Sequence, residues 1–442
     1  MMQLKTITFS GLVNWSIQYL LEATFSYNLD YSLVPISKFL TRNKTSINIE
    51  DGVEYKRVTI RANNLGIHLR DTEKGENIGT KKQFVIKKGQ FLVSKIDARN
   101  GAFGVIPDEV DGAVITGNFW TFDVDTSIIN PYFLSLIVTT PEFIKFCENA
   151  SNGTTNRHYL QEDLFLAQPI PLPPLPEQNR IVAQYNQKIK LAQQQEQEAD
   201  NLENEIIAYL YITLGIPKNA IENRNTKLMF LMYSNMYRWD GKDTSILKSN
   251  YKLLRVEDLI KDISTGTTPP TNRKEYFENG SVNFYTPADL TDTKDLFNAD
   301  RKVTELAIKE NKARRFIKDT LLFVGIGSTV GKVGIIKSDY ATSNQQITGV
   351  YFDFEKVDIN YIYYFFNYFQ HITTSEKTQS TIPIVNQNKI LNIQVPIPDK
   401  KIQLEIVNHI NDLKRQIKDL RIKAHKNREE ALFNFEQEIF NS

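Results

Sequence analysis

Several short stretches of this chain carry residue types that could act on nucleotides or nucleic acids. Phe323-Val-Gly-Ile-Gly327 fits the Phe-x-Gly-x-Gly pattern with which amino-methyltransferases bind their methyl donor. Such an enzyme also needs an Asn- or Asp-Pro-Pro-aromatic element to hold the target amine, and the sequence contains none. The related stretch Val93-Ser-Lys-Ile-Asp97 lacks the glycines. We therefore interpret the pattern as a strand followed by a glycine turn.

The overlapping stretch Gly325-Ile-Gly-Ser-Thr-Val-Gly-Lys332 is similar to a phosphate-binding loop, but Val333 replaces the Ser or Thr that would hold magnesium. This excludes a nucleotide site of that kind. We expect instead a glycine-shaped loop that presents Ser328, Thr329 and Lys332 to DNA phosphates or base edges. Asp97-Ala-Arg-Asn-Gly101 would present Arg99 and Asn100 in the same way. Arginine suits guanine and asparagine suits adenine in the major groove.

Amides and basic clusters extend this set of candidate DNA contacts. Ser343-Asn-Gln-Gln346 supplies Asn344 and Gln345, and Asn118 lies at the equivalent place earlier in the chain. Although each basic cluster taken alone is ordinary solvated surface, we select Arg57 and Lys95 from them. The clusters are Arg42, Lys44, Lys56, Arg57 and Arg61; Lys81, Lys82, Lys87, Lys88, Lys95 and Arg99; and Lys309, Lys312, Arg314, Arg315 and Lys318.

Other kinds of site are not indicated. The five histidines (68, 158, 371, 409 and 425) have no metal-ligand spacing, and no Ser/His/Asp or paired-carboxylate arrangement is evident. The single cysteine, Cys147, excludes an internal disulfide and favours a reducing compartment, so we expect the cytoplasm and a buried, inert thiol. The start of the chain has no signal-peptide pattern, and no apolar run is long enough for a membrane role.

The composition is that of a globular protein with more than one domain. The chain has 442 residues, of which 41% are hydrophobic and 24% charged. The net charge of +1 argues neither for nor against a nucleic-acid partner. Only the local clusters can decide that question.

The elements that must position these residues occur twice. The junction Gln168-Pro-Ile-Pro-Leu-Pro-Pro-Leu-Pro-Glu-Gln-Asn-Arg-Ile-Val182 returns 225 residues later as Gln394-Val-Pro-Ile-Pro-Asp-Lys-Lys-Ile-Gln-Leu-Glu-Ile-Val407. Tyr31 to Leu40 parallels Tyr251 to Ile260, and Lys88 to Ile96 parallels Lys318 to Ile326. The chain is therefore a duplication. The five prolines at 169 to 176 predict an extended, semi-rigid stretch there.

Each half combines a mixed domain with a long helix. Strands are predicted at 55–60, 84–86, 91–96, 114–116, 118–124, 282–286, 320–326, 333–336 and 349–354, and helices at 131–140, 141–147 and 359–369. The boundaries are 1–177 for the first mixed domain, 178–214 for the central helix, 215–398 for the second mixed domain and 399–442 for the C-terminal helix. The predicted fold class is mixed α/β, with two tandem duplicated domains separated and joined by the helices.

Apolar residues at spacings of three and four form one seam on each helix. The first seam runs through Ile181, Tyr185, Ile189, Ala192, Ala199, Leu202, Ile206 and Leu210; the second runs through Ile402, Ile406, His409 or Ile410, Leu413, Ile417, Leu420, Leu432, Phe435 and Ile439. We expect the helices to pair as an antiparallel coiled coil with a pseudo-two-fold axis and a mixed domain at each end. Such a rod, roughly 55 Å long, suits two DNA half-sites at a set separation.

These features together resemble the specificity subunit of type I restriction-modification systems. The resemblance rests on the Pro-Leu-Pro-Pro-Leu-Pro-Glu-Gln-Asn-Arg-Ile-Val junction, its partial copy at 396 to 407, and the Lys-Gly-Gln-Phe-Leu-Val-Ser-Lys-Ile element, and it covers essentially the whole chain. It implies that each mixed domain is a target recognition domain that reads half of a bipartite site in double-stranded DNA.

The resemblance also implies partners. Two modification (methyltransferase) subunits would dock on the helices, where Gln178, Arg180, Gln403 and Glu405 are the predicted contacts, and a restriction (translocase) subunit is a further partner. The chain itself would hold no cofactor, because S-adenosylmethionine, ATP and Mg²⁺ would bind to those subunits. It would recognise DNA and scaffold the complex, while adenine methylation and cleavage of unmodified DNA belong to its partners.

The two halves differ within this resemblance. Residues 264 to 290 match the family's Gly-Thr-Pro element and its aromatic-Thr-x-x-Asp element, which adds Thr286 to the candidate DNA contacts, whereas residues 43 to 60 depart from both. This predicts an asymmetric target with two unlike half-sites. Three alternatives remain open: a coiled-coil adaptor without DNA contact, the specificity subunit of a related methylation system that is not type I, and a self-sufficient methyltransferase.

Overall fold

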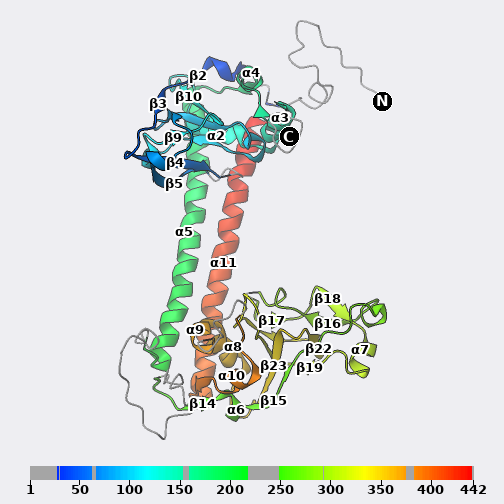
Figure 1. Cartoon of the computed structure of the whole chain (residues 1–442). Coiled ribbons are helices and arrows are strands. Elements are labelled where there is room, and N and C mark those ends of the chain that lie inside the picture. Colours follow the sequence, from blue (N-terminus) through cyan, green and yellow to red (C-terminus); the bar gives the residue numbers. More distant parts are fainter. Residues whose placement is uncertain are drawn as a thin grey trace. The chain divides into compact units, whose positions relative to one another are not determined.

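The chain folds into two units, each with its own β-sheets and apolar cores (Figure 1). The computed structural model describes residues 27–28, 30–61, 66–152, 159–217, 248–291, 293–374 and 383–440. Unit 1 comprises Met1–Gln195 with Ile422–Ser442, and unit 2 comprises Glu196–Arg421. Trp15 and Trp239, interpreted from the sequence as core or interface residues, and His158 lie outside the described residues.

Unit 1 contains two larger sheets, one antiparallel and one mixed, and two small antiparallel strand pairs. The strand orders are β2-β10-β7-β8, β3-β6-β9-β4-β5, β1-β13 and β11-β12. The strands are β1 (Leu33–Pro35), β2 (Leu40–Asn43), β3 (Ser46–Asn48), β4 (Glu54–Ile60), β5 (Ile67–Lys74), β6 (Lys82–Val85), β7 (Phe91–Ser94), β8 (Phe103–Val105), β9 (Val114–Ile115), β10 (Phe119–Val124), β11 (Ser151–Asn152), β12 (Tyr159–Leu160) and β13 (Pro169–Pro171).

Short helices cover the β2-β10-β7-β8 sheet of unit 1. They are α2 (Pro131–Val138), α3 (Pro141–Asn149) and α4 (Glu162–Ala167). Asn130 and Thr140 cap α2 and α3, and each is followed by a proline in the first turn, where its missing N–H is harmless. The helices bury aromatic side chains against the sheet. Phe143 and Phe165, for example, lie against Phe103 with ring centroids 6.2 and 6.3 Å away.

Unit 2 contains the strand orders β15-β23-β20-β21-β17, β18-β16-β22-β19 and β14-β24. The strands are β14 (Leu253–Arg255), β15 (Ile260–Thr265), β16 (Val282–Tyr285), β17 (Asp295–Leu296), β18 (Arg301–Val303), β19 (Arg315–Ile317), β20 (Leu321–Val324), β21 (Val333–Ile336), β22 (Tyr340–Ser343), β23 (Ile347–Phe352) and β24 (Gln394–Pro396). The short helices are α6 (Val256–Leu259), α7 (Glu305–Lys309), α8 (Ile359–Tyr368), α9 (Gln370–Thr373) and α10 (Gln387–Leu391).

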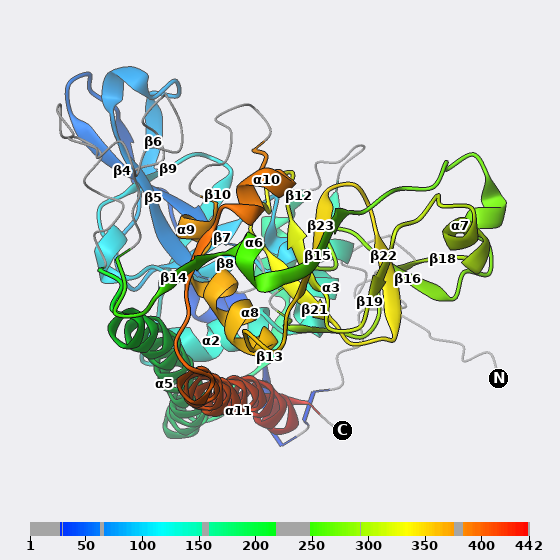
Figure 2. The same ribbon diagram turned by 90° about the horizontal axis from the view of Figure 1, so that it is seen from below.

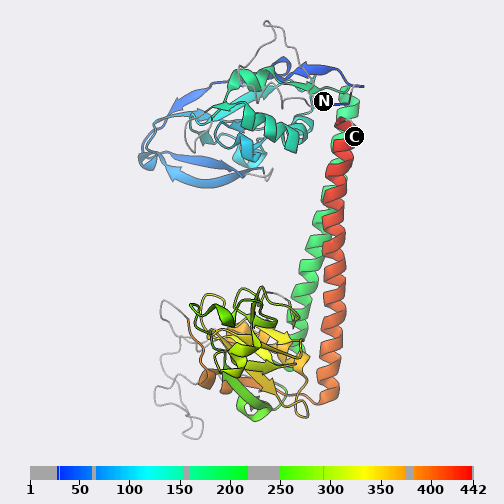
Figure 3. The same cartoon turned by 90° about the vertical axis from the view of Figure 1, so that its right-hand side faces the viewer.

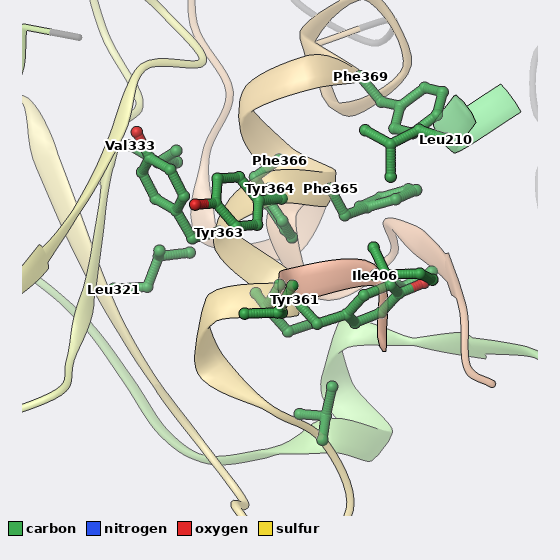
Figure 4. Close-up of a cluster of buried hydrophobic side chains, with 14 of the residues drawn as sticks. Leu210, Leu321, Val333, Tyr361, Tyr363, Tyr364, Phe365, Phe366, Phe369 and Ile406 are labelled. Carbon is green, nitrogen blue, oxygen red and sulfur yellow. The ribbon is translucent and has the colours of Figure 1, made fainter. Parts of the chain in front are cut away.

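Helix α8 joins the five-stranded sheet of unit 2 to the long helices (Figures 2 and 4). Tyr361, Phe365 and Phe366 on α8 are buried in one cluster with Leu321 and Val333 of the sheet. Leu210 and Ile406, from the long helices, belong to the same cluster. An apolar side chain of this size contributes about 1.5–3 kcal/mol when fully buried. This cluster therefore holds the sheet of unit 2 firmly to its helical segments.

The long helices are α5 (Leu175–Leu214) and α11 (Lys400–Ile439). Their segments lie side by side and antiparallel within each unit (Figures 1 and 3). Ion pairs link them: Arg180 to Glu438 and Lys188 to Glu430 in unit 1, and Lys414 to Glu203 and Arg421 to Asp200 in unit 2. The seam between them is narrow, because alanines at 192, 199, 424 and 431 are fully or almost fully buried. The predicted antiparallel coiled coil is confirmed in each unit.

Two details of the helices differ from the prediction, and a third settles the seam position that the sequence left open. Helix α5 begins at Leu175, because Pro176 fits the first turn, so the predicted extended stretch ends at Pro174. At the ambiguous seam position Ile410 is fully buried, while His409 lies beside the Tyr209 ring with centroids 4.2 Å apart. Leu432 was wrongly placed in the seam: it is exposed, and its neighbour Ala431 is buried instead.

The duplication is confirmed strand by strand. In unit 1, β1 pairs with β13, the strand before α5. In unit 2, β14 pairs with β24, the strand before α11. The sheet order β2-β10-β7-β8 of unit 1 returns as β15-β23-β20-β21 in unit 2. Asp125 N donates to Phe39 O at 2.9 Å, and Asp353 N donates to Leu259 O at 2.8 Å, at matching points. The predicted mixed α/β class with two duplicated domains and two long helices is the observed fold.

Candidate nucleic-acid interface

Most of the candidate DNA contacts gather at one edge of the repeated sheet. In unit 1 this edge is where β7 ends and β10 begins, and Lys95 N donates to Asn118 O at 2.9 Å. In unit 2 it is where β20 ends and β23 begins, and Gly325 N donates to Gln346 O at 2.8 Å. These two hydrogen bonds are equivalent, since each follows the last ladder pair of its strands. The backbone therefore brings the two sets of loops to the same place in each fold.

Lys95 is held against the protein at the unit 1 edge. Its ammonium nitrogen lies 5.5 Å from the centre of the Trp120 ring. Burial lowers the pKa of Lys95, and the nearby Arg42 lowers it further, while Glu162 opposes both effects. Arg42 and Glu162 are themselves 3.4 Å apart. The edge thus carries a fixed cation with a carboxylate close by.

A short turn next to Lys95 presents Arg99 and Asn100. The Ser94 hydroxyl donates to the Asp97 carboxylate at 3.2 Å, and the Asp97 carbonyl accepts from Asn100 N at 2.8 Å. Gly101 closes the turn with a φ of 74°, which a larger residue adopts only with strain. Arg99 is partly buried and Asn100 is exposed. Asn118, also exposed, lies across the edge from them.

Arg57 lies in the other sheet of unit 1, away from this edge. Its guanidinium forms two hydrogen bonds to the Asp71 carboxylate, at 2.6 and 2.9 Å, and lies 3.6 Å from Glu73. The hydrogen bond from Arg57 lowers the pKa of Asp71. A DNA phosphate or base would have to compete with these carboxylates for Arg57.

In unit 2, Ser328 and Lys332 belong to the turn between β20 and β21. Ser328 is exposed and Lys332 partly buried. Lys332 N donates to Thr329 O at 3.2 Å, and Gly327 has a φ of 114°. At Gly331 (φ 96°) an added Cβ would lie 2.6 Å from the Thr374 methyl group. The glycines therefore allow the backbone conformation of this turn, as the sequence predicted. The Phe-x-Gly-x-Gly stretch is the end of strand β20 followed by the turn.

The amide run before β23 is also built into a turn. The Asn344 carbonyl oxygen Oδ1 accepts from Gln346 N at 3.1 Å, and Asn344 Nδ2 donates to Gln346 Oε1 at 2.9 Å. Gln345 is exposed, and its Oε1 accepts a hydrogen bond from the Thr268 hydroxyl. Thr286 lies elsewhere: its hydroxyl and its backbone N–H both donate to Asp289 at 2.7 Å. The aromatic-Thr-x-x-Asp element is therefore a turn that Asp289 closes.

The four predicted partner contacts on the long helices fall into two pairs. Gln178 and Gln403 are both 0% exposed and make hydrogen bonds within their own units. Arg180 and Glu405 are exposed. Arg180 donates to Glu177 and Glu438, which raises the pKa of its guanidinium. Only this second pair can meet a partner without a change in the fold.

Sequence reasoning missed several polar residues beside the unit 2 edge. Gln387 and Asn388, which start α10, lie with Thr265 of β15 around the end of β23. Their types are common and they are more than 40 residues from Gln345, so no local motif marks them. The repeat was the one available signal. Val385 in unit 2 corresponds to Leu160 in unit 1, because Val385 N donates to Gly325 O, just after β20, and Leu160 N donates to Lys95 O, just after β7.

The predictions for other side chains can be read directly from the structure. Cys147 is fully buried, and burial raises the pKa of its thiol. His409 lies at the helix interface, as predicted, beside Tyr209. Across the described ranges, no three His, Cys, Asp or Glu side chains are grouped so that they could hold a metal ion. None of the described helices is long and apolar enough to cross a membrane.

Comparison with known proteins gives a family match over most of the chain. A family model described as the type I restriction modification DNA specificity domain matches residues 33–204 and 248–426. Among curated relatives, the EcoR124I/EcoR124II specificity subunit of Escherichia coli is 26% identical over 186 residues, which is 38% of this chain and 45% of that protein. The HindI specificity subunit of Haemophilus influenzae is 27% identical over 128 residues, 28% of each chain.

These matches span less than half the length of the curated relatives. The fold likeness is broader. A chain from a type I R-M system, solved to describe its complex assembly and conformational transition, superposes with a TM-score of 0.59. That superposition covers 94% of this chain and 97% of the other at 15% identity. It concerns the fold alone.

Proposed function

Because the chain belongs to the type I restriction modification DNA specificity domain family, we propose that it is the DNA-recognition subunit of a type I restriction-modification complex. In this role it reads an asymmetric, bipartite sequence in double-stranded DNA. It catalyses no reaction, and adenine methylation and the cleavage of unmodified DNA are carried out by its partners.

The observation that carries this proposal is the repeated edge. Two copies of one sheet each gather polar and basic turns at the equivalent point, through equivalent backbone hydrogen bonds. Phosphate contacts position a protein on DNA, and amide or guanidinium contacts to base edges read the sequence. Arg99, Asn100 and Asn118 are the proposed DNA contacts of unit 1. Lys95, which lies against Trp120 at the same edge, is a further one. Ser328, Lys332, Asn344 and Gln345 are those of unit 2.

Arg57 and Thr286 remain among the proposed DNA contacts, but we expect less from them than from the other residues. Both have their polar groups engaged by carboxylates, Asp71 and Asp289. A DNA contact by either residue would first have to break that interaction. We therefore expect them to contribute less than the residues at the two edges.

The proposed partners are two modification (methyltransferase) subunits, with a restriction (translocase) subunit as a further partner. The exposed faces of α5 and α11, including Arg180 and Glu405, are the proposed docking surface. S-adenosylmethionine, ATP and Mg²⁺ would bind to the partners, and the complex would act in the cytoplasm. In this proposal the recognition domains comprise residues 1–177 and 215–398, and the helices comprise residues 178–214 and 399–442.

Methylation mapping tests the proposal directly. The full chain would be expressed with its modification partner in a host that lacks adenine methyltransferases, and the methylated sites in the genome would be mapped. We expect one bipartite motif with two different halves. If the methylated adenines share no sequence motif, or if the modification partner alone methylates the same motif, the proposal fails.

A salt series separates the adaptor alternative. If the complex binds DNA as proposed, log Kobs falls linearly with log salt concentration, because bound phosphates release counterions. A coiled-coil adaptor without DNA contact would show no such binding. Methyl transfer by this chain alone would instead support the self-sufficient methyltransferase.

A further inference from the structure

Unit 2 has a polar recess at the edge where its candidate DNA contacts lie. The recess has a volume of about 350 Å³ and opens where β15 and β20 end and β23 begins. Its wall is rich in carboxamides and hydroxyls. The polar side chains that line it are Thr265, Gln345, Gln346, Thr348, Asn386, Gln387 and Asn388.

Backbone hydrogen bonds fix the three segments that form the recess. Val385 N donates to Gly325 O at 2.8 Å, and Gly327 N donates to Pro383 O at 3.2 Å. Gly325 N in turn donates to Gln346 O at 2.8 Å. A Cβ at Gly325 would lie 2.8 Å from Val385 O, so a larger residue would push the segments apart. The recess is therefore a preformed feature of the fold.

The carboxamides keep unused hydrogen-bonding groups on the recess. Gln387 Nε2 donates to the Thr265 hydroxyl at 2.8 Å, which leaves its Oε1 as an acceptor. Gln346 Oε1 accepts from Asn344, which leaves its Nε2 as a donor. Within the described part of the chain, the Asn388 carboxamide has no hydrogen-bond partner and is exposed. The recess thus offers donors and acceptors together.

The lining contains no charge. Of the described residues that form the recess, none is Lys, Arg, Asp or Glu. A phosphate would bind only weakly in the recess, because phosphate binding depends mainly on Lys and Arg. Guanine presents two acceptors in the major groove and suits arginine, whereas adenine presents one acceptor and one donor and suits a carboxamide.

Cations are available just beside the recess. The Thr267 hydroxyl donates to Lys312 O at 3.0 Å and accepts from Arg314 N at 2.9 Å. The next residue, Thr268, donates to Gln345 on the recess wall. Lys312 and Arg314 are both exposed. The backbone of two exposed basic residues therefore lies close to an uncharged, amide-lined surface, from which their side chains could reach the phosphates beside a base edge.

We propose that the recess of unit 2 reads an A·T base pair in the major groove, with Gln346, Gln387 and Asn388 contacting the N6 and N7 positions of adenine and Lys312 and Arg314 contacting the adjacent phosphates. The inference rests on the proposed function, since it assumes that unit 2 meets duplex DNA at this edge. It adds the base that is read and three residues that read it.

Unit 1 keeps a carboxamide, Asn118, at the place of Gln346 but differs at other matching positions, which gives the inference a second consequence. Lys95 occupies the place of Gly325, and Glu162 that of Gln387. A lysine donates only, and it suits guanine rather than adenine. The half-site of unit 1 should therefore not share the A·T requirement of unit 2 at the equivalent position.

The first experiment maps methylation by the full complex carrying the double variant Gln387→Ala, Asn388→Ala. We expect the preference for A at one position of one half-site to fall roughly tenfold to a hundredfold, the discrimination of a good amide–adenine pair. The other half-site should stay unchanged. The matched control is Asn298→Ala, an exposed asparagine of unit 2 outside the recess, which should leave the whole motif unchanged.

The second experiment uses the unaltered complex, so that it does not depend on how the variant folds. Binding is measured on site DNA in which each adenine in turn is replaced by 7-deazaadenine, which lacks the N7 acceptor. One replacement within the affected half-site should weaken binding roughly threefold to tenfold, because it removes one of the two contacts of an amide–adenine pair.

The outcomes separate the two proposals. An unchanged motif in the double variant, or equal binding to every 7-deazaadenine site, overturns the recess and leaves the proposed function standing. If the half-site read by unit 2 contains no A·T pair, the recess inference is likewise overturned and the proposed function still stands. If the unaltered complex methylates no defined motif at all, the proposed function fails, and the recess inference falls with it.

Discussion

Replacing Gln178 with leucine should weaken the attachment of the unit 1 sheet domain to the start of α5. Gln178 is fully buried, and its Oε1 accepts from Asn130 N at 2.8 Å. Its Nε2 donates to Ile128 O at 3.1 Å and to Pro173 O at 2.8 Å. Asn130 is the N-cap of α2, so one side chain ties the proline junction to the helix that covers the sheet.

The magnitude follows from the groups that leucine would leave unpaired. One N–H and two carbonyls lose their partner, and each buried, unsatisfied group costs about 1–3 kcal/mol. Leucine has a similar volume and recovers some apolar packing. We expect the free energy of unfolding of unit 1 to fall by about 2–5 kcal/mol. With a urea m-value of about 2 kcal/mol per M, in the middle of the usual range, the midpoint should move by roughly 1–2.5 M.

Trp120 provides the readout, because it lies in unit 1 and is only 5% exposed. The sequence has three tryptophans, so Trp15→Phe with Trp239→Phe leaves Trp120 as the sole reporter. Urea unfolding of the full chain in this background would be followed by tryptophan fluorescence. The matched control is Gln187→Leu, at an exposed position of the same helix, which should change stability by less than about 0.5 kcal/mol.

A second variant separates this contact from a general effect of the mutation. Gln403 makes the corresponding contacts in unit 2, with Asp358 N at 2.8 Å and Pro398 O at 2.8 Å. Gln403→Leu should leave the Trp120 transition of unit 1 in place. If Gln178→Leu moves the Trp120 midpoint no more than Gln187→Leu does, the reasoning from buried hydrogen bonds is refuted.

Three further predictions concern charge and spacing. Lys312→Gln or Arg314→Gln should weaken binding of the complex to all DNA sequences alike and reduce the salt slope of log Kobs by about 1, measured by fluorescence anisotropy; a change in sequence preference would contradict a phosphate contact. The Arg57–Asp71 pair lowers the pKa of Asp71, so it stabilises the fold above the unfolded pKa of about 4 and this contribution is lost as the pH falls through the lower folded value. Asp71→Asn should therefore lower stability at pH 7 but not at pH 2, in urea titrations at the two pH values. Inserting about four residues after Gln194, with a matched insertion near Asn427, should change the spacer of the methylated motif but not its half-sites; an unaltered spacer would contradict the idea that the helices set the spacing.

The strongest patterns in the sequence predicted their elements closely. Apolar runs gave β21 with both ends correct and β7 and β20 within two residues, because strands buried on both faces leave an unmistakable signal. The repeat of the proline junction predicted two equivalent units and two long helices. Strand β5 was missed, since Ile-His-Leu-Arg-Asp-Thr-Glu-Lys is mostly polar and its strand lies at the edge of a sheet. Its pairing with β4, rather than its composition, makes it a strand.

The candidate site was predictable only in part, for a similar reason. Asn118, Lys95 and the 328–332 turn were marked by the repeat and by glycines, and the fold brings them to one edge. The roles of Gln178 and Gln403 were not predictable, because a glutamine at a helix start is usually exposed. Gln387 and Asn388 reach the recess through the backbone pairing of Val385 with Gly325, which no local pattern reports.

The two edges show why one scaffold can serve two unlike targets. The bonds that shape each edge are made by main-chain atoms: Lys95 N to Asn118 O in unit 1, and Gly325 N to Gln346 O in unit 2. The same main-chain hydrogen bond forms with a lysine in unit 1 and a glycine in unit 2, although at Gly325 the close approach of Val385 O leaves no room for a Cβ. Side chains at the edge are then free to differ in charge, as Glu162 and Gln387 do. In such an arrangement, exchanging Glu162 and Gln387 between the units should alter base preference without loss of the fold, while replacing Gln178 or Gln403 with leucine should destabilise its unit.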